Sequence, residues 1–412
     1  MSHPGEGVVP ATTIAGIALA SALVPLNSTM IAVALPELGD DFGISTGRAS
    51  VLVTVYLVAM LVGQPLAGRL CDVVGARRMA IVATAGFGVV SGAAMLAGSF
   101  GLLVALRAAQ AAFASALAPS VQAMLRGVVP AGQRGRAFGL QGSVLGVGAG
   151  LGPVIGGLVT AGFGWRAIFA VNLPVVVAVL YVLERRVAHA TPPVEVDASV
   201  EPGSSGRLLR GVLAAAFSIQ ALSTLAQYAL LLVVPIVLDH RGWTAGSIGV
   251  ALSALTLGMV VAGPYGGRLG DAFGHRRPVL LGLAVTLAAV SVSVLGGDGV
   301  LSGVLVLTLL LFGLGLGVAT PNLMTAGLEA VPLARAGSAA GLLSASRYVG
   351  SITSTIVLAT IVHDDGSGLQ TLLLLCAASL AVSMIVAGRL PGRHVAAPEL
   401  VHEMEQGQAP TV

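Results

Sequence analysis

Residues 68–78 read Gly-Arg-Leu-Cys-Asp-Val-Val-Gly-Ala-Arg-Arg, and residues 267–277 read Gly-Arg-Leu-Gly-Asp-Ala-Phe-Gly-His-Arg-Arg. We call these stretches the first and the second charged segment. They lie 199 positions apart, each at the end of a long apolar run. A repeat of this kind indicates that the chain is two copies of one unit. In so apolar a chain, each segment is expected to be a short loop that joins two membrane-spanning helices.

The composition independently predicts a membrane protein. Hydrophobic residues make up 56% of the 412 residues and charged residues 9%, with a mean hydropathy of +0.94, whereas soluble domains carry about 25% charged residues. A bilayer-crossing helix needs about 20 mostly apolar residues. Runs of this kind lie near residues 11–35, 47–67, 79–98, 101–125, 137–162, 166–184, 211–238, 246–267, 278–296, 300–328, 337–362 and 369–388. The predicted fold is an all-α integral membrane protein with twelve transmembrane helices in two six-helix halves.

The arginines predict the orientation. All 21 basic residues are arginine, and with both ends of the chain cytoplasmic the cytoplasmic loops hold sixteen of them. The opposite side then holds only Arg48, Arg166 and Arg241. Because positive charge is retained on the cytoplasmic side, we expect a multi-pass protein of the cell membrane with both termini cytoplasmic.

The repeat extends beyond the charged segments. Pro119, Pro130 and Gly139 match residues 202 positions later. The polar stretch between the halves reads as a flexible linker. The predicted domains are an N-terminal six-helix bundle (1–184), a cytoplasmic linker (185–210), a C-terminal six-helix bundle (211–390) and a cytoplasmic tail (391–412). A duplicated membrane bundle with charged hinges at matching points is the layout of a secondary transporter.

The first charged segment resembles the signature between helices two and three of the major facilitator superfamily, and the resemblance covers nearly all of residues 10–390. Gly68 would allow close helix approach, Gly75 a tight turn, and Asp72 would accept hydrogen bonds. The resemblance implies that the segment latches the cytoplasmic side shut in the outward-facing state; the alternative is a cluster that only sets topology. The candidate switch residues are Gly68, Asp72, Gly75, Arg77, Arg78, Gly267, Asp271, Gly274, Arg276 and Arg277.

Residues 146–157 read Gly-Val-Gly-Ala-Gly-Leu-Gly-Pro-Val-Ile-Gly-Gly. Glycines four residues apart let another helix backbone approach closely, and a proline inside a helix favours a kink. Ordinary small-residue packing would explain the string equally simply. The string nevertheless resembles the antiporter signature of the drug:proton antiporter branch, which implies proton-coupled export of drugs or natural products by alternating access. The motif residues are Gly148, Gly152, Pro153, Gly156 and Gly157.

Two arginines lie inside predicted spans. Arg107 is about 10 Å and Arg347 about 15 Å from a span end at 1.5 Å per residue. A buried arginine costs a few kcal/mol or more in hydrocarbon and therefore should face the bundle interior. Arg107 matches the helix-four arginine that the branch associates with proton transfer. The alternative is that its side chain snorkels to the outer surface.

The chain also departs from that branch. Asn27 occupies the place where the branch usually carries an intramembrane aspartate, and asparagine cannot titrate. No acidic residue lies deep in any predicted span. The nearest proton carriers are Glu37, Asp239 and Glu329 at span ends, where solvated helix-end charges are the favoured interpretation. Alternatively, the substrate itself carries the charge, or transport is facilitated.

The substrate pocket is expected at the midplane between the halves. Arginine without a nearby acid disfavours cations, so we expect a neutral or anionic amphiphile as substrate, protons as coupling ion, and a monomer without nucleic-acid partner, cofactor or metal. Uptake or facilitated movement of a metabolite is the alternative, since fold does not settle substrate. An enzyme would need an acid, base or nucleophile at membrane depth. An ATP-driven pump would need a loop that binds phosphate, and the sequence shows no such loop. The candidate substrate or coupling residues are Asn27, Tyr56, Gln64, Arg107, Gln141, Gln220, Gln227, Tyr228, Asn322 and Arg347.

Overall fold

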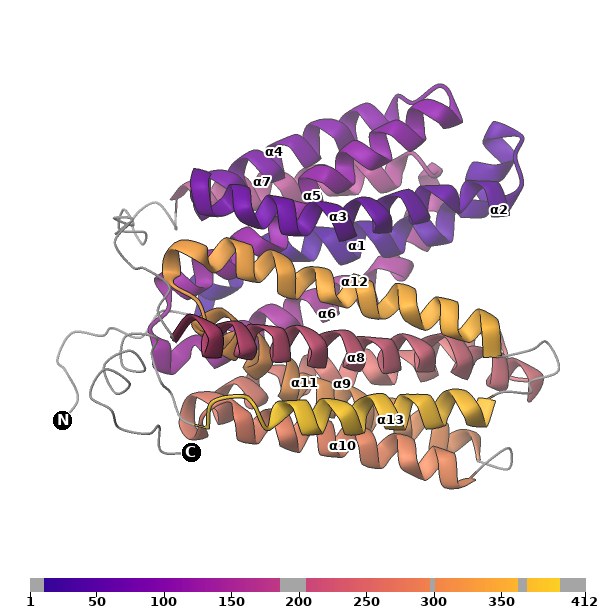
Figure 1. The fold of residues 1–412 in the computed structure, drawn as a ribbon. Helices are drawn as coiled ribbons and strands as arrows, with labels where there is room; N and C mark the ends of the chain where they lie inside the picture. Colours follow the sequence, from indigo (N-terminus) through magenta and orange to yellow (C-terminus); the bar gives the residue numbers. More distant parts are fainter. Residues whose placement is uncertain (1–10, 186–204, 297–300, 362–368, 393–412) are drawn as a thin grey trace. The chain divides into compact units, whose positions relative to one another are not determined.

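The computed structural model describes residues 11–185, 205–296, 301–361 and 369–392, and within these ranges the regular structure is helical (Figure 1). The predicted linker and tail lie largely outside the described residues. The long helices of the first repeat are α1 (Ala11–Phe42), α3 (Val51–Val74), α4 (Ala76–Met95), α5 (Phe100–Val128), α6 (Arg134–Phe163) and α7 (Ala167–Arg185). Those of the second are α8 (Ser205–His240), α9 (Ala245–Phe273), α10 (Arg276–Gly296), α11 (Ser302–Glu329), α12 (Ala336–Ile361) and α13 (Leu369–Ala387). Short helical turns are α2 (Thr46–Ala49), η1 (Ala131–Gln133) and η3 (Leu333–Arg335).

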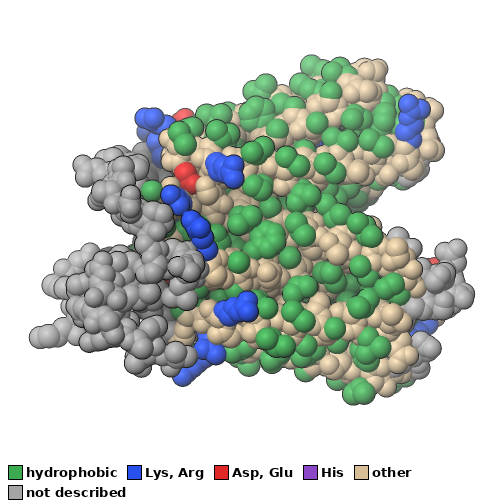
Figure 2. Space-filling view, in the orientation of Figure 1, with side chains coloured by type: hydrophobic (Ala, Val, Ile, Leu, Met, Phe, Trp, Pro, Cys, Tyr) green, Lys and Arg blue, Asp and Glu red, His purple; other side chains and the backbone are tan. Residues whose placement is uncertain are grey.

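Eleven helices in the described ranges are long and apolar enough to cross a membrane. The exception among the long helices is α12, along which serine and threonine recur and lower the mean hydropathy. On the face drawn in Figure 2, hydrophobic side chains cover the long helices and the arginines lie mainly near helix ends. A chain with this surface is a multi-pass membrane protein.

The charged segments are helical over most of their length, which corrects the prediction that they form loops. Helix α3 continues through the first segment to Val74, and α4 begins at Ala76. Only Gly75 separates them, with a positive φ of 93°, and Gly274 separates α9 from α10 with a φ of 79°. No proline interrupts either segment, so the helix ends only where glycine allows the left-handed turn. Asp72 therefore lies on the last turn of α3.

The helices group into two compact units, which we describe separately. Unit 1 comprises Met1–Pro130, Val144–Val196 and Leu333–Ala345, and unit 2 comprises Ala131–Ser143, Asp197–Pro332 and Ser346–Val412. Each unit thus includes the first turns of one helix from the other repeat: α12 in unit 1 and α6 in unit 2.

The same helix pairs pack together in both units. In unit 1, α5 packs on α3, α4 and α1, and α7 packs on α4 and α1. In unit 2, α11 packs on α9, α10 and α8, and α13 packs on α10 and α8. This correspondence follows the order of helices in the two repeats, because similar sequences bury similar faces.

Candidate functional site

Asp72 binds the start of α12 within unit 1. Its carboxylate accepts hydrogen bonds from the backbone N–H groups of Gly337 at 2.7 Å and Ser338 at 2.9 Å, and also from the Ser338 hydroxyl. The first N–H groups of a helix have no partner inside the helix, and the helix dipole favours negative charge there. Asp72 thus caps the N-terminus of α12, although it lies 265 positions from Gly337 in sequence.

Asp271 makes the corresponding contact in unit 2. Its two carboxylate oxygens accept hydrogen bonds from the backbone N–H groups of Gly135 at 2.7 Å and Arg136 at 2.8 Å, at the start of α6. The repeat therefore carries two equivalent caps: the second-to-third helix corner of each repeat binds the first turn of the fifth helix of the other repeat. We refer to Asp72 and Asp271 as the capping carboxylates.

Glycines make room for both caps. A Cβ on Gly68 would lie 3.1 Å from the Cα of Gly341, and one on Gly337 would lie 2.7 Å from the Asp72 carboxylate. In unit 2, a Cβ on Gly267 would lie 2.8 Å from the Arg136 nitrogen. Backbones this close leave no space for a larger side chain, which explains why the charged segments begin with glycine.

The arginines of the charged segments have different surroundings. Arg77 donates from Nε to the Leu183 carbonyl at 3.0 Å and from Nη2 to the Glu184 carbonyl at 3.3 Å, at the end of α7. Arg78 and Arg277 are exposed, and Arg276 is half-buried. Arg77 thus satisfies the final carbonyls of a neighbouring helix, whereas the exposed arginines are placed to meet solvent or lipid headgroups.

A buried polar cluster surrounds Arg107 in unit 1. Its guanidinium is 2% exposed and donates from Nη1 to the Gln110 Oε1 at 2.6 Å. Asn27 donates to the same oxygen at 3.2 Å, and Gln110 donates to the Ser91 hydroxyl at 2.7 Å. The guanidinium also lies over the Tyr56 ring, 4.2 Å from its centroid.

These contacts mean that Arg107 points into the helix bundle of unit 1 and does not snorkel outward. The cluster is completed by Asn172, whose Nδ2 donates to the Asn27 Oδ1 at 3.1 Å. Among the described residues, Arg107 and Asn27 form hydrogen bonds with the neutral side chains of Gln110 and Asn172, and the Arg107 Nε and Nη2 have no hydrogen-bond partner there. The site therefore holds a positive charge that no carboxylate in contact with it balances.

The glycine-rich string of α6 packs on α1 within unit 1. A Cβ on Gly148 would lie 3.1 Å from the Ala22 carbonyl oxygen, and one on Gly152 would lie 2.9 Å from the Thr29 Cβ. Gly156 approaches the Met30 Cα equally closely. These three glycines form one face at four-residue spacing, and Pro153 lies inside α6, which continues through it.

The remaining predicted site residues lie in different surroundings. Gln64 is fully buried, and its side-chain oxygen and nitrogen have no hydrogen-bond partner among the described residues. Gln141 and Gln220 are buried, Gln227 and Arg347 are half-buried, and Tyr228 is 40% exposed. Asn322 is buried and uses its Nδ2 to donate to the carbonyls of Gly266 and Val318, both at 2.8 Å. Asn322 is thus bound to its own unit's backbone.

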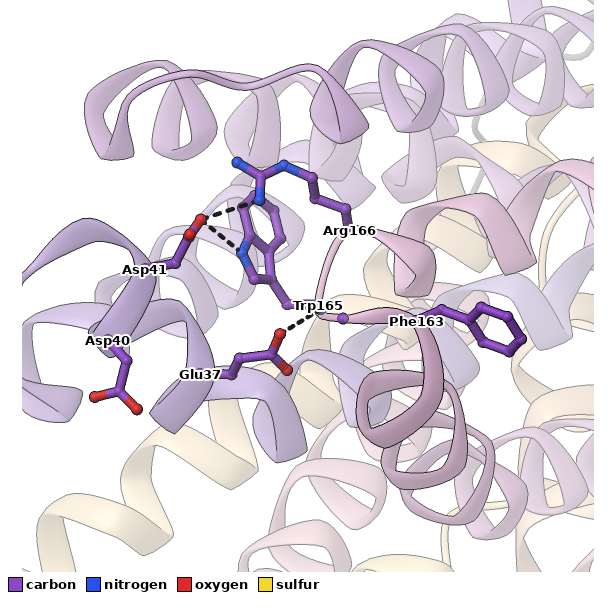
Figure 3. A pocket seen from close by; sticks show the side chains of 7 residues that line it. Glu37, Asp40, Asp41, Phe163, Trp165 and Arg166 are labelled. Carbon is purple, nitrogen blue, oxygen red and sulfur yellow. Dashed lines mark hydrogen bonds and ion pairs between the residues drawn. The ribbon is translucent and has the colours of Figure 1, made fainter.

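A second polar group lies at the far end of α1. Figure 3 shows Asp41 accepting hydrogen bonds from the Trp165 indole nitrogen and from Arg166, each at 3.0 Å, while Glu37 accepts from the Trp165 backbone nitrogen at 3.2 Å. Together with Asp40 these groups line a shallow recess. Glu37 is therefore half-buried and joins α1 to the loop before α7 through this hydrogen bond, so it is more than a solvated helix-end charge.

The prediction that Glu329 is a solvated charge at a helix end is wrong. Its side chain is 12% exposed, and it contacts Arg134 at 3.1 Å and the His275 Nε2 at 3.4 Å. Asp239, by contrast, is exposed. Glu329 is held because the end of α11, the start of α6 and the start of α10 meet within unit 2.

Sequence reasoning missed Gln110, Ser91 and His275. Gln110 follows Arg107 by three positions and so lies on the same helix face, a signal that was available. His275 lies in the second charged segment, which the sequence predicts to be a loop, yet it is 1% exposed, and nothing local in the sequence indicates that burial.

Comparison with known proteins finds one family and several relatives. The family model of the Major Facilitator Superfamily matches residues 17–355 and, again, residues 216–411. The chain is 28% identical to the uncharacterized MFS-type transporter YvkA of Bacillus subtilis, over 91% of this chain and 94% of the relative. It is 29% identical to the tetracenomycin C resistance and export protein of Streptomyces glaucescens, over 85% of this chain and 75% of the relative. A multidrug efflux pump, LfrA of Mycolicibacterium smegmatis, is 35% identical over 44% of this chain and 36% of its own length.

Proposed function

Because the chain belongs to the Major Facilitator Superfamily, and is thus a transporter and not an enzyme, we propose that it exports small organic molecules, drugs or natural products, across the cell membrane. Transport proceeds by alternating access of two six-helix halves, twelve membrane helices in all. The halves are residues 1–184 and 211–390, joined by a cytoplasmic linker over 185–210 and followed by a cytoplasmic tail over 391–412. The chain acts as a monomer with both termini in the cytoplasm.

The observation that carries this proposal is the pair of capping carboxylates. Asp72 and Asp271 each bind the first turn of a helix from the opposite repeat. A carboxylate at a helix N-terminus contributes about 0.3–1 kcal/mol, and up to about 2 kcal/mol when partly buried. Two caps of this free energy are strong enough to populate the conformation in which they form, and weak enough for the protein to leave that conformation. We infer that they break and reform in each transport cycle.

The surroundings of Arg107 support a substrate that is neutral or anionic. Among the described residues, the buried guanidinium contacts the neutral Gln110 side chain and the Tyr56 ring, so a cation brought near it would meet a positive charge that these contacts do not balance. Relatives whose names state resistance and export support export as the direction. Uptake or facilitated transport of a metabolite is the alternative function.

Protons are the proposed coupling ion. The amides of Asn27, Gln110 and Asn172 cannot titrate and no carboxylate or histidine belongs to this cluster among the described residues, so we assign coupling to a carboxylate or histidine outside it. Among the described acidic residues that the sequence singled out, Glu329 is the one held by two basic groups, Arg134 and His275. A group held in this way changes its bonds when it gains or loses a proton.

Transport into inverted membrane vesicles tests the proposal. Neutral and anionic amphiphiles should accumulate when a proton gradient is imposed, and accumulation should collapse when the gradient is removed. Vesicles containing an equal amount of the Asp72→Asn protein serve as the control for carrier-independent uptake. Gradient-independent equilibration would favour facilitated transport, and accumulation only in right-side-out vesicles would favour uptake.

A further inference from the structure

His275 lies at the turn between α9 and α10, in the second charged segment, and is almost fully buried at 1% exposure. Its Nδ1 lies 3.1 Å from the Asn322 Oδ1, and its Nε2 lies 3.4 Å from the Glu329 Oε2. Both ring nitrogens therefore face oxygen atoms of α11. Gly270 of α9 completes the enclosure, because a Cβ there would lie 2.9 Å from Nδ1.

The orientation of Asn322 decides which protons the ring carries. The Asn322 Nδ2 donates to the carbonyl oxygens of Gly266 and Val318, both at 2.8 Å. A flipped amide would place its oxygen against both carbonyls, so Oδ1 must be the atom that faces His275. An amide oxygen only accepts, and the His275 Nδ1 therefore donates.

The second ring nitrogen then faces a carboxylate. If Nδ1 carries the proton of a neutral ring, Nε2 presents a lone pair to the Glu329 oxygen, and the two repel each other. One additional proton on Nε2 removes this conflict, since it converts Nε2 into a donor to the ionised Glu329 carboxylate. Both ring nitrogens have an acceptor when His275 is doubly protonated and the Glu329 carboxylate is ionised.

We propose that His275 and Glu329 form a proton-binding site that ties the start of α10 to the end of α11 and, through Arg134, to the start of α6. The other Glu329 oxygen binds Arg134 at 3.1 Å, and the next residues of α6 are capped by Asp271. Loss of the proton would weaken the hold on α10 next to the Asp271 cap. The site thus makes the second capping carboxylate responsive to pH, while its role in a transport cycle rests on the proposed function.

The first repeat lacks this site. At the positions that match His275, Glu329 and Asn322 it carries Ala76, Gly127 and Ser120. No titratable pair of this kind accompanies Asp72 in the sequence. The proposed response to pH therefore belongs to the second repeat alone. Because the Asp72 cap forms without such a pair, capping itself does not require one.

The charged groups that face His275 can be named element by element. Glu329 faces it from α11, and Arg134 faces Glu329 from the start of α6. Helix α9 carries Asp271, one residue after Gly270, whose carboxylate is bound to backbone N–H groups of α6, and Arg268. On its own helix, Arg276 and Arg277 follow directly. Glu329 is thus the group whose attraction the proton on His275 changes.

Nuclear magnetic resonance of histidine-labelled protein tests the site without any transport assay. The purified full chain in detergent is compared with the His275→Gln protein, which identifies the His275 signals. We expect the doubly protonated ring to make up a larger fraction in the unmodified protein than in Glu329→Gln at the same pH. Equal fractions in the two proteins would overturn the proposal.

Transport then tests the consequence. Substrate exchange is measured with equal pH on both sides, between about pH 5 and pH 8, where histidine ordinarily titrates. In the unmodified protein, exchange at the acidic end should be slower than at the basic end by a factor of roughly five or more, because His275 and Glu329 are then bound to each other. Both Glu329→Gln and His275→Gln should make the exchange rate nearly independent of pH. The matched control His240→Gln removes an exposed histidine and should leave the profile unchanged. An unchanged profile in both test variants would overturn the proposal, whereas absence of any transport would contradict only the proposed function.

Discussion

At the scale of single residues, Asp72 binds the start of a distant helix through its carboxylate alone. Its carboxylate accepts three hydrogen bonds at the start of α12, and asparagine would retain the shape while losing the charge. Charge-assisted hydrogen bonds contribute about 1.5–3 kcal/mol. We predict that Asp72→Asn abolishes most transport while membrane insertion stays normal, measured as vesicle transport per amount of inserted protein.

The matched variant Asp271→Asn provides the comparison. It removes the charge, and one of the two acceptor oxygens, from a cap of the same type, but the sequence around it matches the family signature less fully. We expect it to reduce transport less than Asp72→Asn does. Normal turnover in a well-inserted Asp72→Asn protein would contradict the assignment of a switch to this residue.

Residue charge also underlies the proposed choice of substrate. Asn27 lies in a neutral network beside Arg107, and Arg347 is the second arginine inside a predicted span. We predict that permanently cationic dyes are not exported, that Arg347→Ala loses anionic substrates more than neutral ones, and that Asn27→Asp admits cations. An isolated cation within several Å of a guanidinium meets a repulsion of several kcal/mol at an effective dielectric near 20.

Resistance assays with matched cationic and neutral compounds measure these differences. Because each pair shares one scaffold, a difference within a pair reports charge and not size or apolarity. Robust efflux of a quaternary ammonium dye by the unmodified protein would refute the charge argument.

At the scale of elements, α6 and α1 depend on small residues at their contact. Gly152 faces Thr29, and a Cβ there would already overlap the Thr29 side chain. We predict that Gly152→Leu separates the two helices and locks the carrier or makes it leak, at a cost of about 1–3 kcal/mol from overpacking. Thermal unfolding in detergent and vesicle transport measure the two consequences.

Gly162→Leu is the matched control for this element. Gly162 lies in the same helix and is exposed, and nothing lies within 4 Å of a Cβ placed there. The control should keep stability and transport near those of the parent. Parent-like transport by Gly152→Leu would show that the glycine-rich string is only generic packing.

At the scale of the whole molecule, the distribution of arginine predicts the topology. Sixteen arginines lie in predicted cytoplasmic loops and three on the opposite side, and positive loops stay in the cytoplasm. We predict that a fluorescent reporter fused to the C-terminus folds and fluoresces, whereas an alkaline phosphatase fused there is inactive. An active phosphatase fusion would reverse the orientation and with it the direction assigned to transport.

The sequence by itself determined the features that depend on local composition. Apolar runs of bilayer length predicted helices that the structure describes over similar ranges, and the repeated charged segments indicated the family that the comparison establishes. It placed Asp72 and Asp271 at equivalent points of two repeats. It misjudged where the helices end, because the charged segments continue helically until a glycine such as Gly75 allows the turn.

Only the tertiary structure decided which groups meet. Asp72 reaches a helix 265 positions away, and His275 and Glu329 come together from separate helices. The inward face of a helix that is apolar on every side cannot be read from periodicity, so Gln110 and Ser91 escaped notice although they hold Arg107 and Asn27 in place. Such contacts depend on how helices pack, because burial of a polar group is tolerated only where a distant partner satisfies its hydrogen bonds.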